Sequence, residues 1–231
     1  MADVTPLILL TRPLADAEGF ATMLANMGIA AEVEISPIVE IVPTEVHVDL
    51  TDITGVIFSS RNAVAAVDGY DLPAWCVGEA TAAAAGAKGW RAAAADGDAD
   101  SLYARVLADA PQGPLLHIRG EVARGDLAGR LTKVGIQTRE VVVYRQTAHP
   151  LSERAKTALM RENPVIVPFF SPRAARQFAE QGPFHAPLHV VVMSEAVQAA
   201  LGELPVETVV LAGKKEAKAM ANAVARLLDA G

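Results

Sequence analysis

One short phrase occurs twice in the chain and strongly limits the folds that the chain can adopt. The first copy, Gly55–Val67, reads G-V-I-F-S-S-R-N-A-V-A-A-V, and the second, Val165–Phe178, reads V-I-V-P-F-F-S-P-R-A-A-R-Q-F. Each copy starts with an apolar run, continues through serine and ends in a helix-forming segment. This order is typical of the strand–turn–helix unit from which parallel α/β sheets are built.

Two further units also recur, and in the same order along the chain. The opening P-L-I-L-L-T-R-P corresponds to P-L-L-H-I-R-G, which begins at Pro114, and V-G-E-A-T-A corresponds to V-M-S-E-A-V. This second correspondence aligns Glu79 with Glu195, and both lie in the first turn of an expected helix, where capping explains a glutamate. A further helix is expected to begin with Asp100 as its cap and to extend through Leu107. A repeat of this length predicts two similar α/β domains with parallel sheets rather than a solenoid.

The residues leave two ways to divide the chain into domains. A single cut near Pro111 would give two consecutive halves. The strands expected at Ala30–Val42 and Glu140–Thr147, however, both have the pattern of connections rather than of sheet centres, because Pro37 and Pro43 interrupt or end the first of them. If both strands cross between domains, the middle of the chain is an insertion. The sequence by itself favours neither division.

Composition and charge exclude several classes of function. The formal net charge of −7 argues against nucleic acid or an anionic membrane as a partner. The first residues lack the pattern of a signal sequence, no apolar run is long enough to span a membrane, and the single cysteine, Cys76, is expected to be an inert core thiol. We therefore expect a cytoplasmic protein. The five histidines have no ligand spacing, so we expect no metal.

The candidate binding residues come directly after the expected strands. In an open parallel sheet the ligand lies beyond the carboxyl ends of the strands. Hydroxyl groups, arginines and helix N-termini gather there, and all of them donate hydrogen bonds to anions. The residues are Thr11, Arg12, Ser59, Ser60, Arg61, Gly78, Arg119, Ser171, Arg173 and Ser194.

Their alternative roles are structural. Ser59, Ser60 and Ser171 have no evident histidine partner in the sequence, so we expect helix caps rather than nucleophiles. Arg61 and Arg173 could each be a solvated helix residue, but their equivalent positions in the two repeats favour binding.

The ordered set L-L-T-R-P, V-I-F-S-S-R-N-A-V, V-G-E-A-T-A, L-L-x-I-R-G, V-V-V-Y-R and F-F-S-P-R-A-A resembles the uroporphyrinogen-III synthase family over nearly the whole chain. The resemblance implies two parallel-sheet α/β domains joined by a two-stranded linker, with the active-site cleft between the domains. It favours the insertion: domain 1 would comprise residues 1–38 and 148–231, domain 2 residues 43–143, and the linker residues 38–43 and 143–148.

The resemblance also implies an activity in tetrapyrrole biosynthesis. Enzymes of this family are cyclising lyases that convert hydroxymethylbilane, a linear tetrapyrrole with eight carboxylates, into uroporphyrinogen III. The last ring, ring D, is inverted through a spiro intermediate, and water is lost. The family uses no cofactor. We expect this substrate to be the partner, and we expect a monomer.

Carried over from the family, the cleft residues are Ser59, Ser60, Arg61, Thr81, Tyr144 and Ser171. The resemblance makes Tyr144 the acid that assists departure of the hydroxyl group, because a phenol is protonated at neutral pH and can donate. Where many members carry threonines after the penultimate strand, this chain has Ser194, which we expect to supply that hydroxyl. The alternative to the enzyme is a non-catalytic two-domain cytoplasmic receptor for an anionic small molecule, which would share the fold and the donors.

Overall fold

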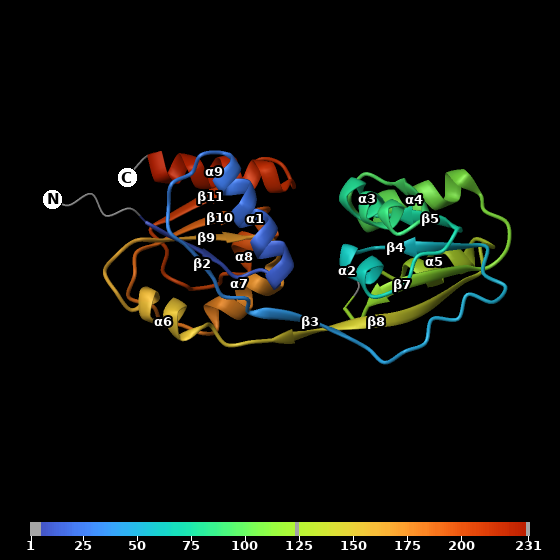
Figure 1. Cartoon of the computed structure of the whole chain (residues 1–231), viewed down its shortest axis with the longest axis horizontal. Helices are drawn as coiled ribbons and strands as arrows, with labels where there is room; N and C mark the ends of the chain where they lie inside the picture. Colours follow the sequence, from blue (N-terminus) through green and yellow to red (C-terminus); the bar gives the residue numbers. More distant parts are fainter. Residues whose placement is uncertain (1–5, 123–124, 230–231) are drawn as a thin grey trace. The chain divides into compact units, whose positions relative to one another are not determined.

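The computed structural model describes residues 6–122 and 125–229, and the chain forms two compact units (Figure 1). Unit 1 consists of Met1–Glu40 and Thr147–Gly231, and unit 2 of Ile41–Gln146. Both units are α/β structures dominated by parallel strands, which confirms the fold class predicted from the repeats. The first residues of the chain, on which the expectation about a signal sequence depends, lie outside the described residues.

Five strands form the sheet in the described part of unit 1. They are β1 (Leu7–Leu10), β2 (Val33–Ile35), β9 (Val165–Phe169), β10 (Leu188–Val192) and β11 (Thr208–Leu211). They lie in the order β11, β10, β9, β1, β2, and neighbouring strands are parallel. Because the strands are parallel, their carboxyl ends lie at one edge of the sheet.

Helices cover both faces of this sheet, as a parallel sheet requires. Helices α1 (Leu14–Asn26) and α9 (Ala217–Asp229) cover one face, and α6 (Glu153–Leu159), α7 (Pro172–Ala179) and α8 (Glu195–Ala199) the other (Figure 1). Strand β1 shows the alternation that produces these layers. Its Ile8 belongs to the apolar cluster that contains Phe20 of α1, whereas its neighbour Leu9 belongs to the cluster that contains Phe178 of α7.

The second sheet lies mainly in unit 2, and six strands of the described chain contribute to it. They are β3 (Val39–Pro43), β4 (Gly55–Phe58), β5 (Pro73–Cys76), β6 (Arg91–Ala94), β7 (Leu115–Gly120) and β8 (Thr138–Ala148). They lie in the order β3, β8, β7, β4, β5, β6, and the pairs from β8 to β6 are parallel. Strand β4 is buried along its whole length at the centre of the sheet, so it reads as a continuous apolar run.

Two helical layers enclose this sheet as well. Helices α2 (Arg61–Ala65) and α3 (Glu79–Ala87) cover the face to which Phe58 belongs, and α4 (Ala99–Asp109) and α5 (Leu127–Lys133) cover the face of Ile57. We expected Asp100 to cap α4, and this was wrong. The cap is Asp98, whose carboxylate accepts a bond from the N–H of Ser101 at 2.8 Å in a reciprocal capping box.

The chain passes between the units in β3 and β8. The N–H of Thr44 donates to the carbonyl of Val143 at 3.0 Å, and the N–H of His149 donates to the carbonyl of Ile38 at 2.9 Å. These two bonds pair residues in opposite order, so the two strands run antiparallel. The long strand expected at Ala30–Val42 is divided into β2 and β3 around Pro37, because proline cannot donate a ladder hydrogen bond. No helix in the described chain is long and apolar enough to cross a membrane.

Candidate active site

The two serines that follow β4 have different partners. Ser60 is the N-cap of α2 and accepts a bond from the N–H of Asn62 at 3.1 Å. The Oγ of Ser59 instead lies 3.0 Å from Nε2 of His117. The expectation that no serine of the site has a histidine partner was therefore wrong for Ser59.

The register of the sheet explains this contact. Ile57 of β4 is opposite His117 of β7, and His117 is opposite Glu140 of β8. Ser59 lies two residues after Ile57, so the pleat brings it to the same face. Three neighbouring strands therefore align a serine, a histidine and a carboxylate in a row. We missed this row because the strand order β8, β7, β4 cannot be read from the sequence. The one signal in the sequence that could have indicated it was His117, a single histidine within the apolar run L-L-H-I of an expected buried strand.

The row continues through charge-assisted hydrogen bonds. Nδ1 of His117 lies 3.1 Å from Oε1 of Glu140, and Arg119 donates from Nη2 to Oε2 of Glu140 at 2.8 Å. Burial lowers the pKa of His117, although Glu140 acts to raise it. Partial burial acts to raise the pKa of Glu140, but the interactions with Arg119 and, to a smaller extent, with His117 together lower that pKa. Near neutral pH the row therefore holds a neutral imidazole beside an ionised carboxylate.

Arg119 is committed to its own unit. Besides the bond to Glu140, its Nη1 donates to the carbonyls of Gly120 at 2.9 Å and Glu121 at 3.1 Å. Its Nε is buried and has no hydrogen-bond partner within the described chain. This guanidinium therefore organises the strand end, and its hydrogen bonds leave little of it to meet a carboxylate of a ligand.

Tyr144 is turned by an irregularity in β8. The register shifts between Arg119 and Gly120, so that Arg119 is opposite Val142 but Gly120 is opposite Tyr144. As a result Val143 and Tyr144, although consecutive, both belong to the core cluster on the α2–α3 face. The Tyr144 ring lies against the backbone of Gly120, where a Cβ atom would meet its ring carbon Cζ at 2.4 Å.

Three further candidates of unit 2 lie on its first two helices. Gly78 is the N-cap of α3, and Thr81 lies in the first turn of that helix with 5% of its surface exposed. Arg61 is the first residue of α2. All three follow β4 or β5, which are neighbours in the sheet, so they lie at the edge that also carries Ser59 and Ser60.

The carboxyl edge of the unit 1 sheet carries the remaining candidates. They follow the adjacent strands β1, β9 and β10 and are Thr11, Arg12, Ser171, Arg173 and Ser194. The Oγ1 of Thr11 is buried and has no hydrogen-bond partner in the described part of the chain. Ser171 is the cap that we expected, because its Oγ accepts the N–H of Ala174 at 3.2 Å. Ser194 is the N-cap of α8 but makes no side-chain cap bond.

Arg12 is oriented by two neighbours at this edge. Its guanidinium carbon lies 3.8 Å from the centre of the Phe170 ring, and its Nη2 lies 3.2 Å from a carboxylate oxygen of Asp16. A cation over an aromatic face is held without losing all of its hydrogen-bond donors. Arg12 is therefore a preoriented cation at the end of β1.

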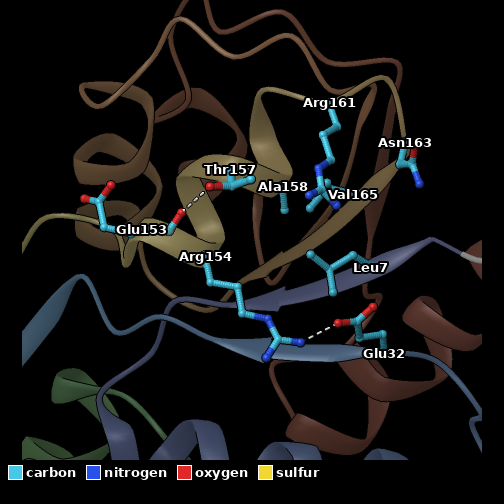
Figure 2. A pocket seen from close by; sticks show the side chains of 9 residues that line it. All are labelled: Leu7, Glu32, Glu153, Arg154, Thr157, Ala158, Arg161, Asn163 and Val165. Atoms are coloured by element: carbon cyan, nitrogen blue, oxygen red, sulfur yellow. Dashed lines mark hydrogen bonds and ion pairs between the residues drawn. The ribbon is translucent and has the colours of Figure 1, made fainter.

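The pocket of Figure 2 is at the opposite end of the same sheet. It has a volume of about 520 Å³, and Leu7 and Val165, the first residues of β1 and β9, line it. An ion pair between Arg154 and Glu32 crosses it (Figure 2). None of the predicted site residues lines this pocket, so it is separate from the carboxyl edge.

Two other chemistries have little support in the described residues. Burial raises the pKa of the Cys76 thiol to about 11, so this side chain is not a thiolate at neutral pH. No group of three histidine, cysteine, aspartate or glutamate side chains in the described ranges could hold a metal ion.

Comparisons with known proteins agree with this architecture. The family model "Uroporphyrinogen-III synthase HemD" matches residues 19–222. The chain is similar to the uroporphyrinogen-III synthetase of Helicobacter pylori 26695, with a TM-score of 0.69, 17% identity, 96% of this chain and 99% of the other covered. It is also similar to a mutant uroporphyrinogen III synthase of Thermus thermophilus, with a TM-score of 0.54, 15% identity and 98% and 100% coverage.

A search of curated protein sequences returned no match. At these identities the structural likenesses establish the fold, whereas the family model extends over both units of the chain. The sequence motifs, the two parallel sheets and the family match lead to one assignment: the chain belongs to the uroporphyrinogen-III synthase family.

Proposed function

We propose that the chain is the lyase that closes hydroxymethylbilane to uroporphyrinogen III in tetrapyrrole biosynthesis. The observation that carries this proposal is the family match to residues 19–222, which spans both units. Nothing in the comparisons supports the alternative of a non-catalytic receptor.

Binding of the substrate relies on local donors. The chain has a formal net charge of −7, so it cannot attract an octacarboxylate by its overall charge. Hydroxyl groups, helix N-termini and the preoriented Arg12 can instead bind individual carboxylates. We assign substrate binding to Thr11, Arg12, Ser59, Ser60, Arg61, Gly78, Thr81, Ser171, Arg173 and Ser194. Arg119, which was also expected to bind the substrate, is left out because its guanidinium bonds Glu140 and two carbonyls of its own strand end.

Catalysis then consists of proton transfer and orientation. We assign to the Tyr144 hydroxyl the donation of a proton to the leaving hydroxyl group, so that the C–O bond breaks and water departs. The terminal ring attacks the resulting azafulvene through its substituted carbon, and the spiro intermediate fragments and closes again. The proton released when the ring regains its aromaticity returns to the tyrosinate, which balances the reaction. Tyr144 suits this role because its ring is buried and fixed against Gly120.

The two units are also proposed to be independently folding domains. Domain 1 would comprise residues 1–38 and 148–231, and domain 2 residues 43–143, with a linker at 38–43 and 143–148. The separate apolar clusters on both faces of each sheet support this division.

The experiment that tests the function is an incubation of the purified protein with hydroxymethylbilane, followed by chromatographic separation of the product isomers. Closure without an enzyme gives uroporphyrinogen I, so type III in the product establishes the synthase. Bound but unconverted substrate, with only type I formed at the uncatalysed rate, would establish the receptor.

A further inference from the structure

We propose that His117 is a positioning residue that turns the hydroxyl hydrogen of Ser59 inward, so that Ser59 accepts a hydrogen bond from a pyrrole N–H of the substrate. The tetrapyrrole substrate is part of the proposed function, on which this inference depends. The two serines after β4 would then have opposite roles toward the substrate: Ser60 would donate a hydrogen bond to it, and Ser59 would accept one from it.

The direction of each hydrogen bond in the row follows from the inventory of donors. An ionised carboxylate only accepts, so Nδ1 of His117 must carry the hydrogen that bonds to Oε1 of Glu140. A neutral imidazole has one N–H, and Nε2 is therefore a bare acceptor. The contact of 3.0 Å between Nε2 and Oγ of Ser59 must then be a bond in which the serine donates.

This direction determines what Ser59 can offer to a ligand. A hydroxyl has one hydrogen and two lone pairs, and here the hydrogen is used inside the protein. The lone pairs remain, so Ser59 can accept from an N–H but has nothing to donate to a carboxylate. Ser60 and Ser171 differ from Ser59 in this respect. Each of their Oγ atoms accepts a hydrogen bond from a backbone N–H, so the hydroxyl hydrogen remains available to donate to a ligand. The pyrrole nitrogens are the N–H donors of a tetrapyrrole, and they identify the group that Ser59 would bind.

The surroundings of His117 keep the row in this state. The side chain is 2% exposed, and the polar groups facing it in the described chain are Ser59, Arg119 and Glu140, which come from β4, β7 and β8. The positive charge of Arg119 disfavours protonation of the imidazole, and its ion pair with Glu140 holds that carboxylate in place. Helices α4 and α5 add apolar side chains to this face. Of the charged residues on these two helices, Arg130 pairs with Asp100 at 2.8 Å and Arg105 pairs with Asp109 at 2.9 Å.

The same row of serine, histidine and carboxylate occurs in hydrolases, so a nucleophilic serine is the alternative. That chemistry also needs preorganised donors for the oxyanion of the intermediate. The N–H of Asn62, in the first turn after the serines, already donates to Ser60. We therefore assign the row to positioning and make the nucleophile an outcome of the test.

The first experiment measures the imidazole itself and needs no substrate. In protein with ¹⁵N-labelled histidine near pH 8, NMR should show His117 with hydrogen on Nδ1 and a bare, hydrogen-bonded Nε2. In Ser59→Ala the tautomer should persist while the Nε2 resonance shifts, because the donor is gone. Hydrogen on Nε2 in the wild type would overturn the proposal, whether or not the protein is a synthase.

The second experiment is a double-mutant cycle on turnover of hydroxymethylbilane. His117→Phe keeps a ring in the core but removes the acceptor, and Ser59→Ala removes the hydroxyl. Each single variant should raise KM by about three- to tenfold, the range of one neutral hydrogen bond, with a smaller change in kcat. His117→Phe should add nothing in the Ser59→Ala background.

Three results would contradict this assignment. Additive effects in the cycle would show that His117 acts independently of Ser59. An unchanged KM in Ser59→Ala would show that the hydroxyl does not bind the substrate. Labelling of Ser59 by a fluorophosphonate, absent in His117→Phe, would identify a nucleophile instead. If the wild type makes no type III product, the proposed function is wrong. The NMR experiment still tests, independently of that function, whether Ser59 donates its hydrogen bond to His117.

Discussion

The close contact between Gly120 and Tyr144 allows the position of the tyrosine to be changed without changing the tyrosine. A Cβ atom at Gly120 would lie 2.4 Å from Cζ, 2.6 Å from Cε2 and 2.7 Å from the hydroxyl oxygen of Tyr144. Ordinary contact begins at 3.4 Å, so the ring must move by about 1 Å in Gly120→Ala. The ring is 4% exposed and packed in a core cluster, so it cannot move without disturbing its neighbours.

Both stability and activity should respond. Overpacking of this kind destabilises by about 1–3 kcal/mol. A displacement of about 1 Å in a catalytic group lowers kcat by about 100-fold. Gly86→Ala is the matched control, because Gly86 lies in α3 with nothing within 4 Å of an added Cβ. That control should keep full activity and gain about 0.5–1 kcal/mol of stability from the helix.

The assay combines urea unfolding with initial rates of uroporphyrinogen III formation, in Gly120→Ala, Tyr144→Phe and the double variant. Tyr144→Phe removes the hydroxyl but keeps the two ring carbons that the new Cβ meets first. The losses of stability should therefore be close to additive. The losses of kcat should not add, because displacement of the ring and removal of its hydroxyl disable the same donor. Normal kcat in a folded Gly120→Ala, or multiplied losses in the double variant, would refute the role of Tyr144.

The remaining predictions concern single groups and the domains. Tyr144→Phe alone should lower kcat by about 100-fold or less in stopped-assay rates, because the pyrrole nitrogen already expels the hydroxyl, and its product should remain type III. Arg61→Ala should raise KM by about tenfold with little change in kcat, because one carboxylate bond is lost equally from ground and transition states. A fragment of residues 44–143 should give a dispersed amide NMR spectrum, whereas residues 1–111 should not fold. In urea titrations, the free energy of unfolding should fall as the pH drops below about 6.5. The reason is that the unfolded chain then takes up a proton at His117, whereas the native imidazole, with its lowered pKa, does not. A smaller fall in His117→Phe would show that His117 causes this pH dependence.

Much of the fold could be predicted because its signals are local. The repeated strand–serine–helix phrase predicted β4 with α2 and β9 with α7, and the residues after the strands are at the carboxyl edges as expected. Strand β6 was missed because its sequence, R-A-A-A, has no strand propensity. It forms through pairing with β5, from Pro73 opposite Arg91 to Cys76 opposite Ala94, which is a tertiary effect.

The parts of the site that could not be predicted depend on how strands pair. Ser59, His117 and Glu140 are far apart in sequence, and only the order of β4, β7 and β8 brings them into a row. The face of the sheet that Tyr144 occupies depends on the register shift at Gly120, which no local pattern indicates. The helix start at Asp98 differs from the expected Asp100, because only the capping box with Ser101 distinguishes two nearby aspartates.

The ratio of uroporphyrinogen III to uroporphyrinogen I, measured as the concentration of the protein is raised against a fixed amount of hydroxymethylbilane, tests the central claim most directly. Spontaneous closure competes in every sample and supplies an internal reference. If the protein is a synthase, the fraction of type III should rise with protein concentration and approach completion when catalysis outruns spontaneous closure. A product that stays type I at every concentration, while the protein remains folded, would contradict the account.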